Sequence, residues 1–167
     1  MTDWDTLVAQ EGPTVWRILW KLLGDRSDVE ECFQETFVTA VELSRREAAT
    51  SWPAVLIRMA TARGMDRLRS RYRSRRRQVV LEAAVLAKTG GGASPDDPVA
   101  LAIASELSER LREGLAQLPG QHSEIFILHA LQGWSYRDIG ERMNMTETAI
   151  RTAIHRARQR LRELLDV

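Results

Sequence analysis

Side chains that could read DNA recur along one face of a helix predicted near the carboxyl end of the chain. Thr148, Arg151, Thr152 and His155 fall together on that face. From Thr148 to His155 the helix spans about 10 Å at 1.5 Å per residue, close to the width of a major groove. Between Arg151 and Arg162 there are five arginines and no acid. A helix of this composition is suited to lie in the groove of a DNA duplex.

The residues before this helix predict the first half of a helix-turn-helix. Ser135 precedes Asp138 by three residues, an approximate capping box that starts a short helix. Asn144 tolerates the left-handed conformation of a tight turn, and Thr146 caps the helix that follows. Gly140 leaves room for another helix to cross closely. A solvated helix in an ordinary bundle would explain the charged face alone, but the combination of these features favours DNA.

Charge is balanced over the whole chain but unevenly spread. The 167 residues carry 24 Lys and Arg against 23 Asp and Glu. Residues 1–62 carry ten acids against six bases, whereas residues 63–77 carry eight Arg against one acid. The total therefore hides two basic patches, one in each half, as expected of a protein that binds nucleic acid.

Cysteine usage and hydropathy limit the protein class. The single cysteine, Cys32, excludes an internal disulfide and a multi-cysteine zinc site, and it is expected to be a packed thiol inside a helix. No apolar run approaches the length needed to cross a bilayer, and the start of the chain has no secretory signal. The sequence predicts a cytoplasmic protein with no metal or cofactor.

Apolar residues recur at helical spacing along most of the chain, which predicts an all-α fold. Gly24-Asp25 separates the first helix from the second, which starts near Asp28. A polar loop over 45–51 then precedes the third helix, which starts at Trp52-Pro53. The expected inward faces are Trp16, Leu19, Trp20 and Leu23 in the first helix; Val29, Phe33, Phe37 and Ala40 or Val41 in the second; Val55, Met59, Ala62, Met65, Leu68 and Tyr72 in the third; and Ile150, Ile154, Ala157 and Leu161 in the last.

Two small helical domains are expected, at residues 1–77 and 109–167, joined by a linker at 78–108. Thr89 to Pro98 reads TGGGASPDDP, which combines flexible glycines with proline stops. A helical pattern resumes near Val99 and ends at Leu118-Pro119-Gly120. Neither domain is expected to have a large core of its own. Such a tether leaves the domains free either to move independently or to pack and mask their basic faces.

These residues resemble the extracytoplasmic-function (ECF) group of the bacterial sigma-70 family of RNA polymerase sigma factors. The segments Gly133-Trp134-Ser135-Tyr136 and Asp138-Ile139-Gly140, and the run over 155–162, are similar to the family's fourth conserved region. The segments over 28–37 and 66–69 are similar to its second region. Family members often carry Asn, Ala and Arg where this chain has Ala62, Gly140 and Ala153.

The resemblance implies a sigma factor that reads two promoter elements and binds core RNA polymerase. The helix-turn-helix would read the −35 element through Arg137, Thr146, Glu147, Thr148, Arg151, Thr152, His155, Arg156 and Arg158. The amino-terminal domain would bind and melt the −10 element through Arg45, Arg46, Ser51, Trp52, Arg58, Arg63, Arg67, Arg69 and Arg71, with an unstacked base received by the loop from Arg45 to Trp52. The clamp helices of the polymerase β′ subunit would bind Asp28, Glu30, Glu31, Gln34 and Glu35. Contact with the β flap and a cognate anti-sigma factor are also implied.

Two alternatives stand beside this reading. A stand-alone helix-turn-helix regulator would account for the carboxyl-terminal half, but such proteins usually dimerise and no heptad seam is evident. An enzyme such as a recombinase would need a nucleophile or a metal-binding cluster. Ser44, Ser51 and Ser70 have no partner residues evident in the sequence, and Glu31 and Glu35 fit a solvated helix face better than a metal site.

Overall fold

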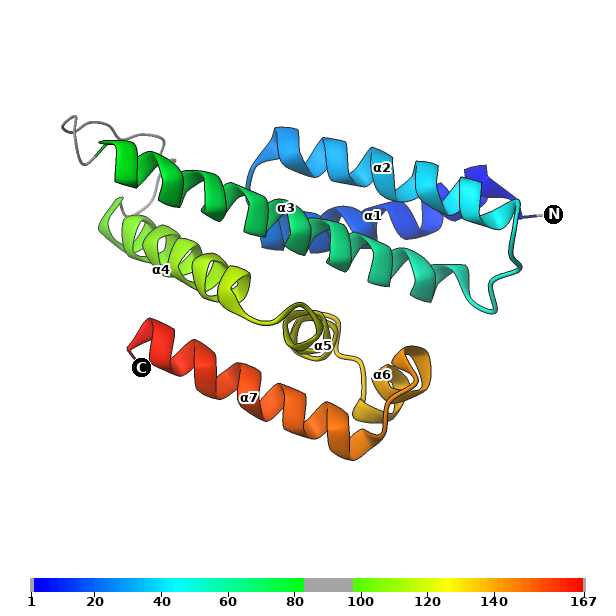
Figure 1. Cartoon of the computed structure of the whole chain (residues 1–167). Helices are drawn as coiled ribbons and strands as arrows, with labels where there is room; N and C mark the ends of the chain where they lie inside the picture. The colour runs from blue at the N-terminus through cyan, green and yellow to red at the C-terminus, as the bar shows by residue number, and fades with distance from the viewer. Residues whose placement is uncertain (1, 83–97, 167) are drawn as a thin grey trace.

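Helices are the only regular structure in the described part of the chain, residues 2–82 and 98–166 of the computed structural model. In chain order they are α1 (Trp4–Leu23), α2 (Arg26–Ser44), α3 (Trp52–Glu82), α4 (Pro98–Gln117), α5 (Gly120–Ala130), α6 (Tyr136–Met143) and α7 (Glu147–Leu165). α1, α2 and α3 form a bundle, α4 runs beside the carboxyl-terminal half of α3, and α5 lies between α3 and α7 (Figure 1). The predicted all-α fold with two helical groups is confirmed.

The boundaries of the first three helices follow from local chemistry. Asp3 caps α1 by accepting a hydrogen bond from the backbone N–H of Thr6, and Gly24 ends α1 in the left-handed conformation, with φ of 60°. Asp25 then caps α2 by accepting from the N–H of Asp28. The predicted break at Gly24-Asp25 is therefore confirmed. The segment between α2 and α3 is the predicted polar loop.

Two of the predicted inward faces are partly wrong. Trp20 is 46% exposed, because the face of α1 that packs on the bundle is centred on Ile18 and Leu22, and Trp20 lies on the other side. In α3 the residue at position 62 is exposed, whereas Leu56, Ala60, Met65 and Leu68 are fully buried or nearly so. Several helices pack around α3, so its buried surface is wider than the single stripe that periodicity predicts.

The predicted helix-turn-helix is confirmed in its local details. Ser135 and Asp138 form a complete capping box, and Asn144 ends α6 in the left-handed conformation with φ of 53°. Thr146 caps α7 by accepting from the N–H of Ala149 at 3.2 Å. Gly140 is needed because the turn itself, and not another helix, passes close to it: a Cβ there would lie 2.6 Å from the carbonyl oxygen of Met145.

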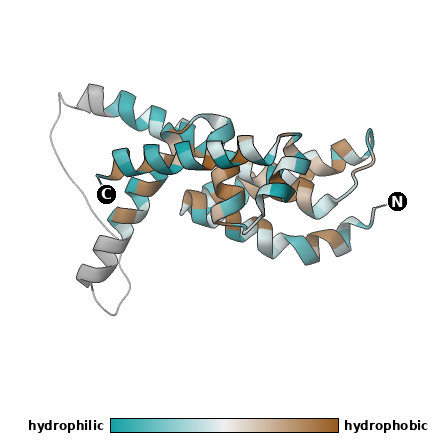
Figure 2. Cartoon of the chain, turned by 90° about the horizontal axis from the view of Figure 1, so that it is seen from below, coloured by the Kyte–Doolittle hydropathy of each residue, from teal (hydrophilic) through white to brown (hydrophobic). Residues whose placement is uncertain are grey.

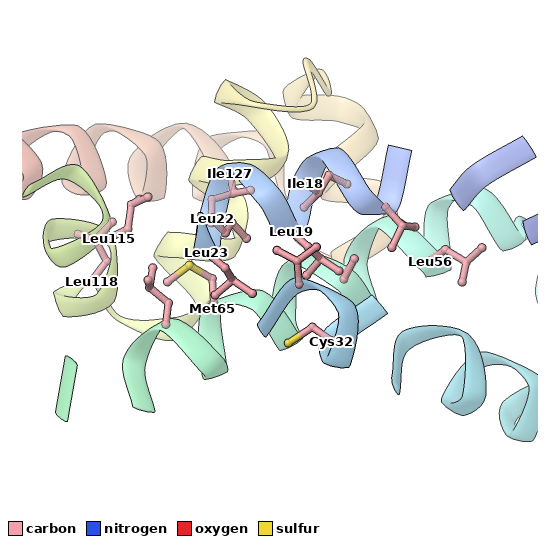
Figure 3. Close-up of a cluster of buried hydrophobic side chains, with 14 of the residues drawn as sticks. Ile18, Leu19, Leu22, Leu23, Cys32, Leu56, Met65, Leu115, Leu118 and Ile127 are labelled. Carbon is pink, nitrogen blue, oxygen red and sulfur yellow. The ribbon is translucent and has the colours of Figure 1, made fainter. Parts of the chain in front are cut away.

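One cluster of buried apolar side chains joins the two helical groups. Leu22 of α1 and Met65 of α3 belong to this cluster (Figure 3). It also contains Leu115 of α4, Ile127 of α5, and Leu118, which lies between these two helices. Each such side chain stabilises the fold by about 1.5–3 kcal/mol when fully buried. The two helical groups therefore share one apolar cluster. A second cluster fixes the helix-turn-helix and contains Ile125, Leu128, Ile139, Ile150, Ala153 and Ile154.

Both helices that flank the predicted linker extend into it. α3 continues to Glu82 and α4 begins at Pro98, so parts of the segment 78–108 are helical. The stretch from Thr89 to Asp97 lies outside the described residues. The residues of α3 itself become mostly hydrophilic toward its carboxyl end (Figure 2). Among the described helices, none is long and apolar enough to cross a membrane.

Two helix glycines provide a matched test of crowding around the turn. A Cβ on Gly12 would meet the ring of Phe33 at 3.5 Å, an ordinary contact, whereas a Cβ on Gly140 would clash with the backbone. We expect Gly12→Ala to change the free energy of unfolding by less than about 1 kcal/mol, because the gain in helix propensity is opposed by the new Cβ beside the ring of Pro13. We expect Gly140→Ala to lower it by about 1–2 kcal/mol. Urea unfolding followed by circular dichroism measures both, and an undiminished stability of Gly140→Ala would contradict the crowding.

Candidate nucleic-acid interface

The face of α7 predicted to read DNA is open to solvent. Thr148, Arg151, Thr152 and His155 are all exposed, and the opposite side of α7 is buried through Ile150, Ala153, Ile154, Ala157 and Leu161. The other predicted members of this set are exposed as well: Arg137, Thr146, Glu147, Arg156 and Arg158. The buried side of α7 belongs to both core clusters, and the exposed and buried sides of α7 lie as its amphipathic pattern predicts.

Aromatic rings line the connection between α5 and α6, and one of them reaches α7. The guanidinium of Arg151 lies 5.9 Å from the ring centre of Tyr136, and this ring lies 4.8 Å from that of His129. Nδ1 of His129 lies 2.9 Å from the carbonyl oxygen of Trp134. The guanidinium of Arg142 lies 5.0 Å from the ring centre of Trp134. Sequence reasoning did not assign these roles; the closely spaced Trp134 and Tyr136 were the only signal.

Arg137 lies at the start of α6, close in sequence to the capping box. Its Nε is 2.9 Å from Oε1 of Glu141, and this hydrogen bond raises the pKa of Arg137. Both side chains are largely exposed, so solvent screens this i, i+4 pair and it adds little to the stability of the helix. A phosphate group could therefore displace Glu141 from Arg137 at little energetic cost.

The arginines of α3 are paired with acids of α2. Arg63 Nη1 lies 2.8 Å from Oε2 of Glu35, and Arg67 Nη2 lies 2.5 Å from Oε2 of Glu31. Arg71 contacts the carboxylate of Asp28 and donates to the carbonyl oxygen of Leu23 at 2.7 Å. Arg67 also reaches Asp28, at 3.7 Å. Six residues predicted to serve two different partners thus pair with one another along the α2–α3 seam.

Two further members of the predicted polymerase-binding set point away from that seam. Glu30 pairs with Arg26 on its own helix at 2.7 Å, and Gln34 is exposed. The side chain of Glu30 is 49% exposed. This exposed strip of α2, Glu30 with Gln34, remains accessible to another protein.

Arg58 and Arg69 connect α3 to the carboxyl-terminal helices. Nε of Arg58 lies 3.0 Å from Oε1 of Glu124, and its Nη1 donates to the carbonyl oxygen of Arg142 at 3.1 Å. Arg69 donates to the hydroxyl of Ser123 at 2.6 Å and pairs with Asp66 at 3.3 Å. Both predicted DNA-contacting side chains therefore face protein partners in this structure.

A hollow of about 790 Å³ lies between the loop that follows α2 and the carboxyl-terminal helices. Its walls are Leu43, Glu47, Ala48, Ala49, Thr50, Ser51, Ala54, Val55, Arg58, Met59, Ala62, Glu124, Glu141 and Arg142. Arg45 and Arg46 are exposed at the start of the loop, and Trp52 at its end packs edge-on against Trp4, with ring centres 5.1 Å apart. The loop is thus anchored at one end and has a cavity large enough for a nucleobase beneath it.

The cysteine and the possible metal ligands were the other candidates for a reactive site. Cys32 is 1% exposed, and burial raises the pKa of its thiol, which confirms the predicted packed thiol. Within residues 2–82 and 98–166, no group of three or more His, Cys, Asp or Glu side chains could hold a metal ion.

Known families match both halves of the chain. Residues 7–74 match Sigma-70 region 2, and residues 108–161 match Sigma-70, region 4. The two matched segments coincide with the helical groups that carry the α3 arginines and the helix-turn-helix.

Known relatives extend the similarity over nearly the whole chain. The ECF RNA polymerase sigma factor SigE of Mycolicibacterium smegmatis is 30% identical over 99% of this chain, which spans 62% of the length of SigE. SigW of Bacillus subtilis is 26% identical over 90% of this chain and 82% of its own length, and CarQ of Myxococcus xanthus is 28% identical over 96% and 88%. The sigma factor RpoE of Bartonella quintana, crystallised with the anti-sigma factor NepR, has a similar structure over 100% of this chain and 99% of the RpoE chain. The TM-score is 0.55 and the sequence identity is 22%, which indicates the same fold.

Proposed function

The chain belongs to the ECF group of the sigma-70 family, and we propose that it directs core RNA polymerase to promoters through the residues described above. The family is non-enzymatic, and it recognises the −10 element with region 2 and the −35 element with region 4. Both regions are present here. The open basic face of α7 is the observation that carries the proposal, because it pairs a groove-sized set of polar side chains with flanking arginines.

For the −35 element, α7 lies in the major groove of the duplex. Thr148, Arg151, Thr152 and His155 read base edges from the exposed face, with Glu147 at its start. Arg137, Arg156 and Arg158 contact phosphates, which fixes the register of the protein without reading sequence. The ring of Tyr136 beneath Arg151 supports a fixed direction for that guanidinium.

For the −10 element, the region 2 side of the hollow, formed by the loop and the start of α3, receives an unstacked base. Ser51 lies in its wall, Trp52 anchors the loop, and Arg45 and Arg46 lie exposed nearby for the backbone. The arginines of α3 hold the remaining phosphates once they leave their carboxylate partners. Ala62 lines the same hollow, and its methyl group offers no hydrogen bond to a base.

For core polymerase, the exposed strip of α2 is the docking surface, in the cytoplasm where sigma factors act. Glu30 and Gln34 contact the clamp helices of the β′ subunit, with Asp28, Glu31 and Glu35 of the α2–α3 seam at the edge of the contact. Region 4 meets the β flap. An anti-sigma factor is a further partner, supported by the fold shared with RpoE of Bartonella quintana, which was crystallised with the anti-sigma factor NepR.

A stand-alone helix-turn-helix regulator is the alternative, favoured only by the exposure of α7. The two readings differ in what the protein needs for tight binding to promoter duplex. A sigma factor needs core polymerase, whereas a stand-alone regulator binds its operator alone.

Two arginines of α7 separate base reading from phosphate binding. We expect Arg151→Ala to remove base preference at one position of the upstream element, a loss of about 1–3 kcal/mol of discrimination. We expect Arg158→Ala to weaken binding to all sequences alike. The slope of log affinity against log salt concentration should fall in magnitude by about one, as for the loss of one phosphate contact. Binding of the polymerase holoenzyme to a randomised promoter library measures both. Unchanged base preferences in Arg151→Ala would refute the assignment of this face.

The exposed strip of α2 can be tested without disturbing the α2–α3 seam. We expect Glu30→Lys combined with Gln34→Lys to abolish co-purification with core polymerase, because two positive charges replace a surface suited to a basic partner. Glu163→Lys, which alters an exposed acid of α7, is the matched control and should retain association. Circular dichroism checks that the helices are intact. Full association of the double variant would move the docking surface elsewhere.

A further inference from the structure

Region 4 lies on region 2 through a row of polar contacts that runs along α3. At one end, Arg58 is held by Glu124 and by the carbonyl oxygen of Arg142. Farther along α3, Arg69 donates to Ser123. These contacts flank the shared apolar cluster, so the two regions meet over both polar and apolar surface.

The other end of the row is closed by Glu109 of α4. The hydroxyl of Tyr72 lies 3.1 Å from Oε2 of Glu109, and Arg75 Nη1 lies 3.4 Å from the same carboxylate. Arg112 of α4 pairs with Glu109 at 2.8 Å and donates to the carbonyl oxygen of Lys21 in α1. Hydrogen bonds from Arg112 and Tyr72 lower the pKa of Glu109 although burial alone would raise it, so the carboxylate is charged at neutral pH.

In this arrangement one DNA-reading surface is exposed, whereas residues of the other are paired with region 4. The base-reading face of α7 is exposed, whereas Arg58 and Arg69 of the −10 set are occupied by region 4. The hollow beside the loop also has Glu124 and Glu141 in its wall, and both carboxylates repel a phosphate backbone. Arg58 cannot bind a phosphate and Glu124 at once with the same edge of its guanidinium.

We propose that α4 and α5 form an intramolecular latch on α3, which closes the −10 reader of the free protein and leaves the −35 reader open. The inference rests on the proposed function. The apparent affinity of the −10 reader is its intrinsic affinity multiplied by the fraction of molecules that are open. A partner that separates region 4 from α3, as core polymerase would, therefore activates single-strand binding.

The latch is tested in the full-length chain by neutralising one carboxylate at each end of the interface. The variants are Glu124→Gln, Glu109→Gln and the two combined, and the matched control is Glu163→Gln, whose carboxylate pairs with Arg160 within α7. The probe is fluorescein-labelled single-stranded DNA of random sequence. Small-angle X-ray scattering gives the radius of gyration without DNA, and circular dichroism gives the helix content.

We expect each latch variant to bind the single strand about threefold more tightly or better, and the combined variant to add the two effects. The radius of gyration should rise in the same order, and Glu163→Gln should change neither quantity. If Glu124→Gln does not fold, Glu109→Gln at the other end carries the test. Unchanged affinity and radius in both single variants would overturn the latch. Equal tightening in Glu163→Gln would also overturn it, since removal of any acid would then suffice.

Failure of the latch and failure of the proposed function give different results. With core polymerase present, the wild type and Glu124→Gln should bind promoter fragments equally well, because both are then open. If the wild type forms an active holoenzyme but none of the latch variants opens, the latch alone is contradicted. A wild type that never confers promoter binding on core polymerase would contradict the proposed function, and the latch with it.

Discussion

The arginines of α3 require carboxylate partners, and this requirement organises the molecule. An arginine side chain cannot lose its charge at physiological pH, so each one that is drawn into a packed seam must find an acceptor. Arg63, Arg67 and Arg71 find acids of α2, and Arg58 finds Glu124 of α5. The same cations that would hold a DNA backbone thus hold the protein's own helices together while no DNA is present.

The energetic weights of these contacts suit a reversible arrangement. Half-exposed ion pairs contribute at most about 1 kcal/mol each, whereas the fully buried apolar residues of the shared cluster contribute several times more in total. The apolar cluster therefore stabilises the fold, and the arginine pairs determine which surfaces meet. Weak polar pairs can be exchanged for phosphate contacts at little net change in free energy, which is a useful property for a protein that must move between partners.

Sequence reasoning succeeded where structure is set locally. Capping by Ser135 and Thr146, the left-handed Asn144 and the buried face of α7 all depend on residues within a few positions of one another. It failed where distant elements decide: Trp20 is exposed, and α3 buries more than one stripe because helices from both halves pack on it. Periodicity also could not reveal that Glu31 and Glu35 face arginines about thirty residues away, nor that the two halves share one core. The roles of the predicted DNA-binding and polymerase-binding residues stay predictions.

Transcription in vitro with purified core polymerase on genomic fragments, followed by mapping of the start sites, tests the central claim most directly. The account predicts that core polymerase alone initiates at no defined sites, that addition of this protein produces discrete start sites, and that these sites share one upstream and one downstream sequence element. Discrete complexes of the protein with duplex DNA in the absence of polymerase, with no stimulation of initiation when polymerase is added, would contradict the account and favour a stand-alone regulator.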